Sequence, residues 1–221
     1  MAKLKYKLEP SSLKGFYRIV YLKDVVDSNN GFVYVKAGEY GGLVEDKNTL
    51  SQEGSCSILD SAMVYNGARV RDNAIVADKS VVMGGSVISN DSAVLEGSVV
   101  ANGSIVCGNA IVSGEACITD RSVITDYAIV TDGAIVKQSV VSGDANISQM
   151  AILENKSQAK DNAYISGQAH LSNTRVCGNA CVDGETILTS CNLYKNTQIS
   201  GGTYTLRTFV GTSEEIEKIT D

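Results

Sequence analysis

The sequence predicts an all-β solenoid in which short parallel strands wind around one narrow core. A small residue (Ala, Ser, Thr or Cys) recurs at almost every sixth position from Cys56 to Thr197. An aliphatic residue follows two positions after each small residue, and Ala159 is the single exception. A fixed short repeat indicates a solenoid, because one repeat cannot bury its own apolar face whereas a stack of repeats can.

Each repeat is predicted to consist of a three-residue strand and a three-residue corner. In residues 110–115, alternation along the strand places Ala110 and Val112 inside the coil and Ile111 outside. The next three residues, Ser-Gly-Glu, have turn chemistry, since glycine accepts a positive φ and the polar side chains reach water. Pro10 is the only proline, so no strand of the repeat region is interrupted by one.

Three repeats are predicted to form one triangular coil. We label its faces A, B and C, starting with the small residues Ala62, Ala68 and Ala74. Three steps of the repeat are five residues long instead of six, at 134–139, 169–174 and 186–191, and all three fall at the corner from face A to face B. This agreement favours three faces per coil and about eight coils, which at ~4.8 Å per coil make a rod about 40 Å long.

Three regions are predicted. Residues 1–55 lack the repeat and contain two predicted strands, at 16–22 and 31–35, so we expect a β cap that covers the open edge of the first coil. Residues 56–205 form the β-helix. Residues 206–221 form a tail with a short helix from 212, because Ser213 suits an N-cap and Glu214 and Glu215 suit the first turn.

Composition excludes several classes of function. The net charge of −6 argues against nucleic acid as a partner. No apolar run approaches the ~18 residues that a membrane span needs, and the first residues lack the apolar core of a secretory signal. The six cysteines show no C-x-x-C spacing, which predicts free thiols in a reducing cytoplasm and no metal site.

The outward strand positions of face A form an uncharged column. An uninterrupted apolar stripe is typical of an interface, although the high β propensity of Val and Ile offers a simpler explanation for single positions. We therefore predict homo-oligomerisation through this face. The predicted interface residues are Met63, Val81, Val99, Cys117, Ile135, Ile152, His170, Ile187 and Tyr204.

The repeat resembles the hexapeptide-repeat family, whose pattern is [LIV]-[GAED]-x-x-[STAV]-x. That resemblance implies a single-stranded left-handed parallel β-helix and assembly as a parallel trimer. The run Val-Cys-Gly-Asn-Ala, at 106–110 and 176–180, departs from this pattern in the place of its glycine. This variant, together with the segments 36–45 and 48–54, is similar to a narrower group of bacterial and phage proteins, the YdcK-type acyltransferase-like proteins.

His170 is the only histidine and the candidate catalytic residue. Acyltransferases of the hexapeptide-repeat family use a histidine at a subunit interface as general base, with an acyl-CoA as donor. Their motif Ala-His-Ile-Ala-His-Asp, in which the second histidine is the catalytic one, matches Ala169-His170-Leu171-Ser172-Asn173 here, so Asn173 stands where that histidine would be. No Asp or Glu close in sequence is expected to orient His170, and packing at an interface is the structural alternative for this residue.

Two functional hypotheses remain from the sequence. The favoured one is a non-catalytic oligomeric scaffold or binding protein without a cofactor. If it is phage-encoded, as the resemblance allows, it would sequester a small-molecule ligand or inhibit a host protein. The alternative is an acetyltransferase that uses acetyl-CoA, with His170 as general base.

Overall fold

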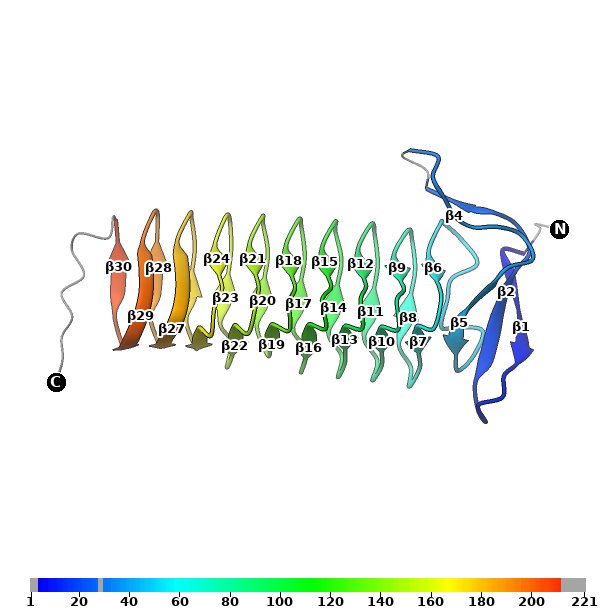
Figure 1. Cartoon of the computed structure of the whole chain (residues 1–221), viewed down its shortest axis with the longest axis horizontal. Helices are drawn as coiled ribbons and strands as arrows, with labels where there is room; N and C mark the ends of the chain where they lie inside the picture. Colours follow the sequence, from blue (N-terminus) through cyan, green and yellow to red (C-terminus); the bar gives the residue numbers. More distant parts are fainter. Residues whose placement is uncertain (1–3, 28–29, 212–221) are drawn as a thin grey trace.

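The computed structural model describes residues 4–27 and 30–211 and confirms the predicted all-β parallel solenoid. Coils of short strands stack along one axis, with the N-terminal strands gathered at one end and the last coil at the other (Figure 1). The described residues contain no helix.

Each coil contributes one strand to each of three faces. Face A contains β5 (Tyr40–Val44), β7 (Met63–Val64), β10 (Val81–Val82), β13 (Val99–Val100), β16 (Cys117–Thr119), β19 (Ile135–Lys137), β22 (Ile152–Glu154) and β25 (His170–Ser172). Face B contains β8 (Arg69–Val70), β11 (Val87–Ile88), β14 (Ile105–Val106), β17 (Val123–Ile124), β20 (Val140–Val141), β23 (Gln158–Ala159), β26 (Arg175–Val176), β28 (Asn192–Tyr194) and β30 (Thr208–Val210). Face C contains β6 (Ser57–Ile58), β9 (Ile75–Val76), β12 (Ala93–Val94), β15 (Ile111–Val112), β18 (Ile129–Val130), β21 (Asn146–Ile147) and β24 (Tyr164–Ile165). Two long strands, β27 (Cys181–Thr189) and β29 (Gln198–Thr205), run from face C through the corner into face A.

The strand register confirms three repeats per coil. Within face A, Val81 pairs with Val99 in parallel, and Ile135 pairs with Ile152 across a coil that is one residue shorter. Face B contains nine strands, one per coil, where the sequence predicted about eight coils. The additional coil arises because β30, which the sequence assigned to the tail, pairs with β28 and extends the solenoid.

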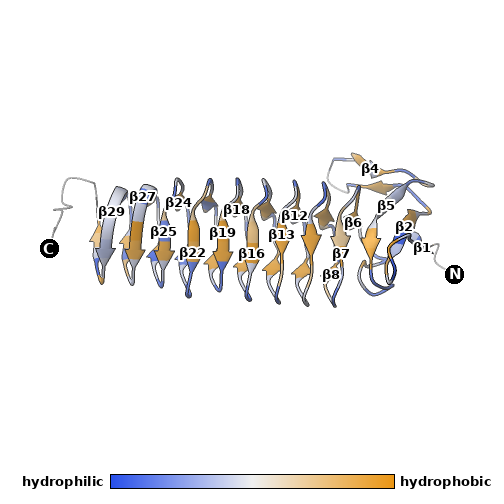
Figure 2. Ribbon diagram, turned by 60° about the horizontal axis from the view of Figure 1, so that its bottom comes forward, coloured by the Kyte–Doolittle hydropathy of each residue, from blue (hydrophilic) through white to orange (hydrophobic). Residues whose placement is uncertain are grey.

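The interior is filled as the repeat predicts. Small and aliphatic residues of the coils before the last, such as Ala110 and Val112, are buried, and one continuous apolar core extends along the solenoid. Figure 2 shows hydrophobic strands connected by hydrophilic corners. Burying each Val or Ile side chain contributes about 1.5–3 kcal/mol, so the stacked coils, and no single coil, supply the stability.

Most six-residue corners close with a turn inside the coil. In residues 125–128, the Ala128 N–H donates to the Thr125 carbonyl at 3.2 Å, while Asp126 adopts a φ of 61°. Asp and Asn tolerate this left-handed conformation. The Asp126 carboxylate also accepts the N–H of Gly143, one coil further, at 3.0 Å. Such corner residues therefore turn the chain and link successive coils.

Five-residue corners have lost the residue that would accept this turn bond. In each of the three, the orphaned N–H donates instead to a side-chain hydroxyl of the preceding coil. The three pairs are Ser139 N to Ser122 Oγ at 3.2 Å, Thr174 N to Ser157 Oγ at 3.1 Å and Cys191 N to Thr174 Oγ1 at 3.3 Å. A buried N–H without a partner is costly, so a hydroxyl in the preceding coil permits each deletion.

The N-terminal cap forms an antiparallel sheet that joins the first coil. Strand β1 (Tyr6–Pro10) pairs with β2 (Tyr17–Tyr21), and β2 pairs with β5, which continues in parallel to β7. A small hairpin of β3 (Val25–Val26) and β4 (Val33–Val35) completes the cap. At the junction, a Cβ on Gly42 would lie 2.4 Å from the Ala62 carbonyl oxygen, so this close approach requires glycine.

Lys5 fastens the cap to the first coil. Its side chain is buried, and its Nζ lies 2.9 Å from the Cys56 carbonyl, 3.1 Å from the Glu53 carbonyl and 3.1 Å from Cys56 Sγ. Burial lowers the pKa of Lys5 and raises the pKa of the Cys56 thiol. These acceptors compensate for the loss of water around the amine.

The last coil is filled by two aromatic rings instead of aliphatic residues. Tyr204 and Phe209 pack against the core with ring centroids 5.5 Å apart and planes at 87°. Their larger area covers the interior at the last described coil. The helix predicted from Ser213 lies outside the described residues.

Candidate functional site

The structure aligns eight of the nine predicted interface residues in one straight column on face A. Parallel pairing joins each of them to the next, so their outward side chains repeat once per coil. The aligned residues are Met63, Val81, Val99, Cys117, Ile135, Ile152, His170 and Ile187. We call this set the face A column.

Tyr204 does not belong to this column, contrary to the prediction. In the last coil Ile187 pairs with Thr203, whereas Tyr204 pairs with the buried Leu188 and points inward. The register shifts between Asp183 and Thr186, where β27 passes through the corner. The outward position therefore falls on Thr203, one residue before the one predicted.

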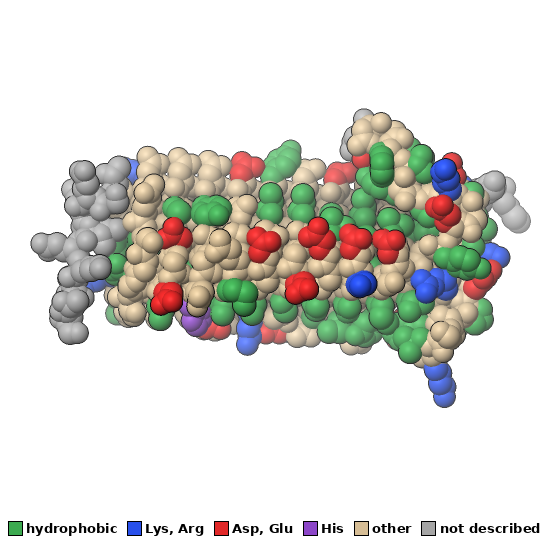
Figure 3. All heavy atoms as spheres, in the orientation of Figure 1, with side chains coloured by type: hydrophobic (Ala, Val, Ile, Leu, Met, Phe, Trp, Pro, Cys, Tyr) green, Lys and Arg blue, Asp and Glu red, His purple; other side chains and the backbone are tan. Residues whose placement is uncertain are grey.

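The face A column stays apolar further along the solenoid than the columns of the other faces. It is half-buried from Met63 to His170, and Ile187 is 43% exposed. By contrast, face B presents Gln158, Arg175 and Asn192 in its last coils. Acidic side chains form a row along the coils in Figure 3, while basic ones gather over the cap. An uncharged strip on so charged a surface is suited to contact with another apolar surface.

His170 faces a carboxylate that lies far from it in the sequence. Its Nε2 lies 3.1 Å from Oε1 of Glu154, and the side chains are 41% and 29% exposed respectively. Glu154 is 16 residues away in sequence, but it belongs to the preceding coil, where it pairs with Ser172. One coil later in the sequence, Glu154 aligns with Ser172, which is two residues from His170. Counting one coil length along the sequence would therefore have identified Glu154 as a neighbour of His170.

The Glu154 carboxylate is itself held in place. Asn155 Nδ2 lies 3.2 Å from Glu154 Oε1 and 2.9 Å from Ser172 Oγ, which joins two successive coils. Such a carboxylate fixes the orientation of the imidazole, as a general base requires. The pair is half-exposed at the edge of the face A column and lines none of the three surface hollows on the cap, beside Lys5 and on face B.

Asn173 does not take the place of a second histidine beside this pair. It adopts a φ of 50° in a short corner, and its Nδ2 donates to Ser190 Oγ at 3.0 Å. Its role in the structure is to turn the chain and connect two coils.

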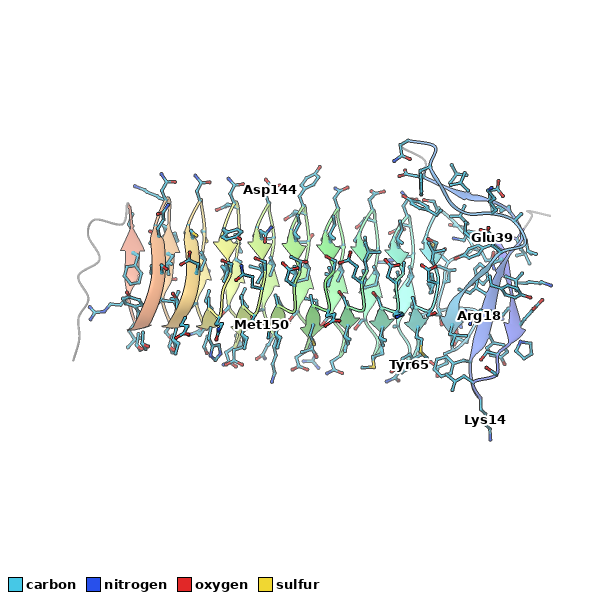
Figure 4. All side chains as sticks on the ribbon, in the orientation of Figure 1. Lys14, Arg18, Glu39, Tyr65, Asp144 and Met150 are labelled. Carbon is cyan, nitrogen blue, oxygen red and sulfur yellow. The ribbon has the colours of Figure 1, made fainter. Side chains whose placement is uncertain are left out.

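Three surface hollows stand out in the described part of the chain. The largest, about 550 Å³, lies on the cap and is lined by Glu9, Pro10, Ser11, Ser12, Arg18, Tyr40 and Leu43. Figure 4 labels Arg18 there, and its Nη1 is held by the carbonyl oxygens of Gly41 and Asp60. A second, of about 330 Å³, lies beside Lys5, and a third, of about 130 Å³, lies on face B.

The cysteines are free thiols, as predicted. Within residues 4–27 and 30–211, no three His, Cys, Asp or Glu side chains come together as a metal site would require. No helix in the same part of the chain is long and apolar enough to span a bilayer. No protein-family model matches the chain, and no curated protein matches its sequence.

Proposed function

We propose that the protein is a rigid oligomeric scaffold whose copies associate through the face A column. The observation that supports this proposal is the straight, uncharged alignment of Met63 to Ile187 over eight successive coils. A second copy in parallel orientation would present the same column at the same spacing. Such self-complementary contacts are common in closed symmetric oligomers.

The size of the column indicates what the interface must include. Eight rungs at ~4.8 Å give a strip about 35–40 Å long, and one about 10 Å wide covers roughly 400 Å². A stable interface buries about 800 Å² on each partner. Flanking corner residues must therefore contribute, and the resemblance to hexapeptide-repeat proteins favours three copies around a central axis.

A lysine in the middle of the column tests this proposal. Ile135→Lys should convert the assembly to monomers, because each interface would have to bury an unpaired charge. Ile111→Lys is the matched control, since it places the same substitution at an outward position of face C. Native mass spectrometry of both variants and of the wild type measures the subunit number.

Dissociation confined to Ile135→Lys would support association through face A. A monomeric wild type, or equal loss of assembly in both variants, would refute it. Circular dichroism should show the same β content in all three proteins, since both substituted side chains lie outside the core.

The His170–Glu154 pair favours a second candidate function, acyl transfer from acetyl-CoA. A base oriented by a carboxylate could take a proton from an acceptor hydroxyl or amine. The resemblance to YdcK-type acyltransferase-like proteins also supports this candidate. The Asn173 corner counts against it, so we place it second.

Loss of the imidazole should separate the two candidates. If the protein is an acetyltransferase, His170→Gln should lower acetyl transfer by about 10²–10⁴-fold, and Glu154→Gln should lower it less. Transfer is measured by mass spectrometry of a mixture of hydroxyl and amine acceptors, and Ile152→Gln serves as the neighbouring control. An unaltered rate in His170→Gln would exclude this histidine as the base.

A further inference from the structure

The hollow on face B, about 130 Å³ in volume, has the composition of a site for a small anion. It lies in the C-terminal half of the solenoid, beside the A-to-B corner. Its lining residues are Lys156, Gln158, Asn173, Thr174, Arg175 and Asn192. Two of these are cations, three carry amides and none carries a carboxylate, although the chain as a whole has a net charge of −6.

Neither cation has an acidic partner. The ion pairs among the described residues join Lys7 to Glu9, Lys137 to Asp120 and His170 to Glu154, so Lys156 and Arg175 are both left without one. Two cations close together repel each other unless an anion lies between them. Their charge is therefore available to a ligand from solution.

The backbone presents the polar side chains to one point. Gln158, Arg175 and Asn192 pair in register on three successive strands of face B, β23, β26 and β28. In the four preceding coils the same column is aliphatic, with Val87, Ile105, Val123 and Val140, and Arg69 stands at its start. Neighbouring strands are ~4.8 Å apart, so three outward side chains of one ladder can contact a single small ligand.

Gln158 has an unfilled hydrogen-bonding capacity beside the hollow. Its Oε1 is buried and has no partner among the described residues. Buried polar oxygens are normally paired, so Gln158 gives up no hydrogen bond of Oε1 when its amide turns toward a ligand in the hollow. Thr174, by contrast, is already committed, since its Oγ1 lies 3.0 Å from the Ser172 carbonyl and 3.2 Å from the Leu188 carbonyl.

We propose that this hollow binds a phosphate group, either free or as a monoester. The hollow is open to solvent, and its volume of about 130 Å³ leaves room for a tetrahedral oxyanion. A guanidinium donates two parallel hydrogen bonds to phosphate, and an ammonium adds a point charge. The Gln158 amide would contact the anion by turning toward the hollow. The site lies on face B and does not depend on association through face A.

Titration with inorganic phosphate and with glycerol phosphate tests the proposal. Binding to the full-length protein is followed by isothermal calorimetry and by the phosphorus NMR line width. Arg175→Gln and Asn192→Asp should each weaken binding at least ~10-fold, since the first removes the fork and the second adds a repelling charge. Arg71→Gln, an exposed arginine on another corner, is the matched control and should leave the affinity within about twofold.

Binding of both phosphates, lost in the two pocket variants and retained in the control, would support the site. Retained binding in Arg175→Gln, or equal weakening in Arg71→Gln, would overturn it, because the protein would then attract anions without a defined site. Acetate that competes as well as phosphate would overturn the assignment to phosphate. Unchanged circular dichroism is required of every variant.

Discussion

Gly143→Ala should destabilise the protein far more than Gly67→Ala, although both glycines adopt a positive φ of 70° and 74° respectively. A Cβ on Gly143 would lie 2.8 Å from the backbone N and O of Asp161 in the next coil, whereas nothing lies within 4 Å of one on Gly67. The left-handed conformation alone costs an alanine about 1–2 kcal/mol. Overpacking against a fixed backbone adds about 1–3 kcal/mol.

The measurement is equilibrium unfolding in urea for the two variants and the wild type. Gly67→Ala should lose only the conformational part, about 1–2 kcal/mol, and Gly143→Ala about 2–5 kcal/mol. Hydrogen exchange should place the additional loss in the coils that contain Gly143 and Asp161, since each coil contacts only its neighbours. Equal destabilisation of the two variants would show that the coils can separate at no cost.

Ser157→Ala should remove a bond on which a shortened corner depends. Ser157 Oγ accepts the Thr174 N–H at 3.1 Å and lies 2.7 Å from the Glu154 carbonyl and 3.0 Å from the Leu171 carbonyl. Alanine would fit the space but would leave the buried N–H unpaired. The expected loss of unfolding free energy is about 1–3 kcal/mol, the desolvation cost of one orphaned donor.

Ser98→Ala provides the control for this prediction. Ser98 occupies the same kind of small inward slot, but its buried Oγ has no hydrogen-bond partner. Removing that hydroxyl should leave stability unchanged or raise it slightly. Thermal and urea unfolding of both variants decide the matter. An equal loss of unfolding free energy in Ser98→Ala and Ser157→Ala would contradict the prediction. It would mean that any serine in a small inward position stabilises the protein, whether or not its hydroxyl is hydrogen-bonded.

The comparison of Ser98 with Ser157 shows what the sequence repeat specifies and what it leaves open. The repeat specifies that a slot is small, and both Ser98 and Ser157 satisfy it equally. Only the neighbouring coil distinguishes them, because the corner before β26, the strand that pairs with β23 after Ser157, is one residue short. The deletions were visible in the sequence, and their position at one corner was predicted correctly. The hydroxyls that accept the N–H groups at these shortened corners were not predicted, since their prediction requires knowing which atom of one coil faces the next coil.

The candidate sites likewise have a part that the repeat predicts and a part that it does not. The face A column followed from the repeat, because a regular step aligns equivalent residues automatically. Tyr204 was misplaced because the last step is irregular and a one-residue slip exchanges inside for outside. The Glu154–His170 pair and the hollow beside Lys156 and Arg175 were not predicted. Both join residues of successive coils at a corner, where the length of the loop decides which side chains meet.

The sequence by itself determined the parallel solenoid, its three faces, the inward and outward sets of residues and the corner that carries the deletions. A strict period of six over many coils determines these, since any other register would expose the aliphatic residues. Only the tertiary structure decided how the ends are closed, with Lys5 buried against Cys56 at one end and the ring pair of Tyr204 and Phe209 at the other. The ends break the repeat, so each is set by contacts between particular side chains that no periodic pattern describes.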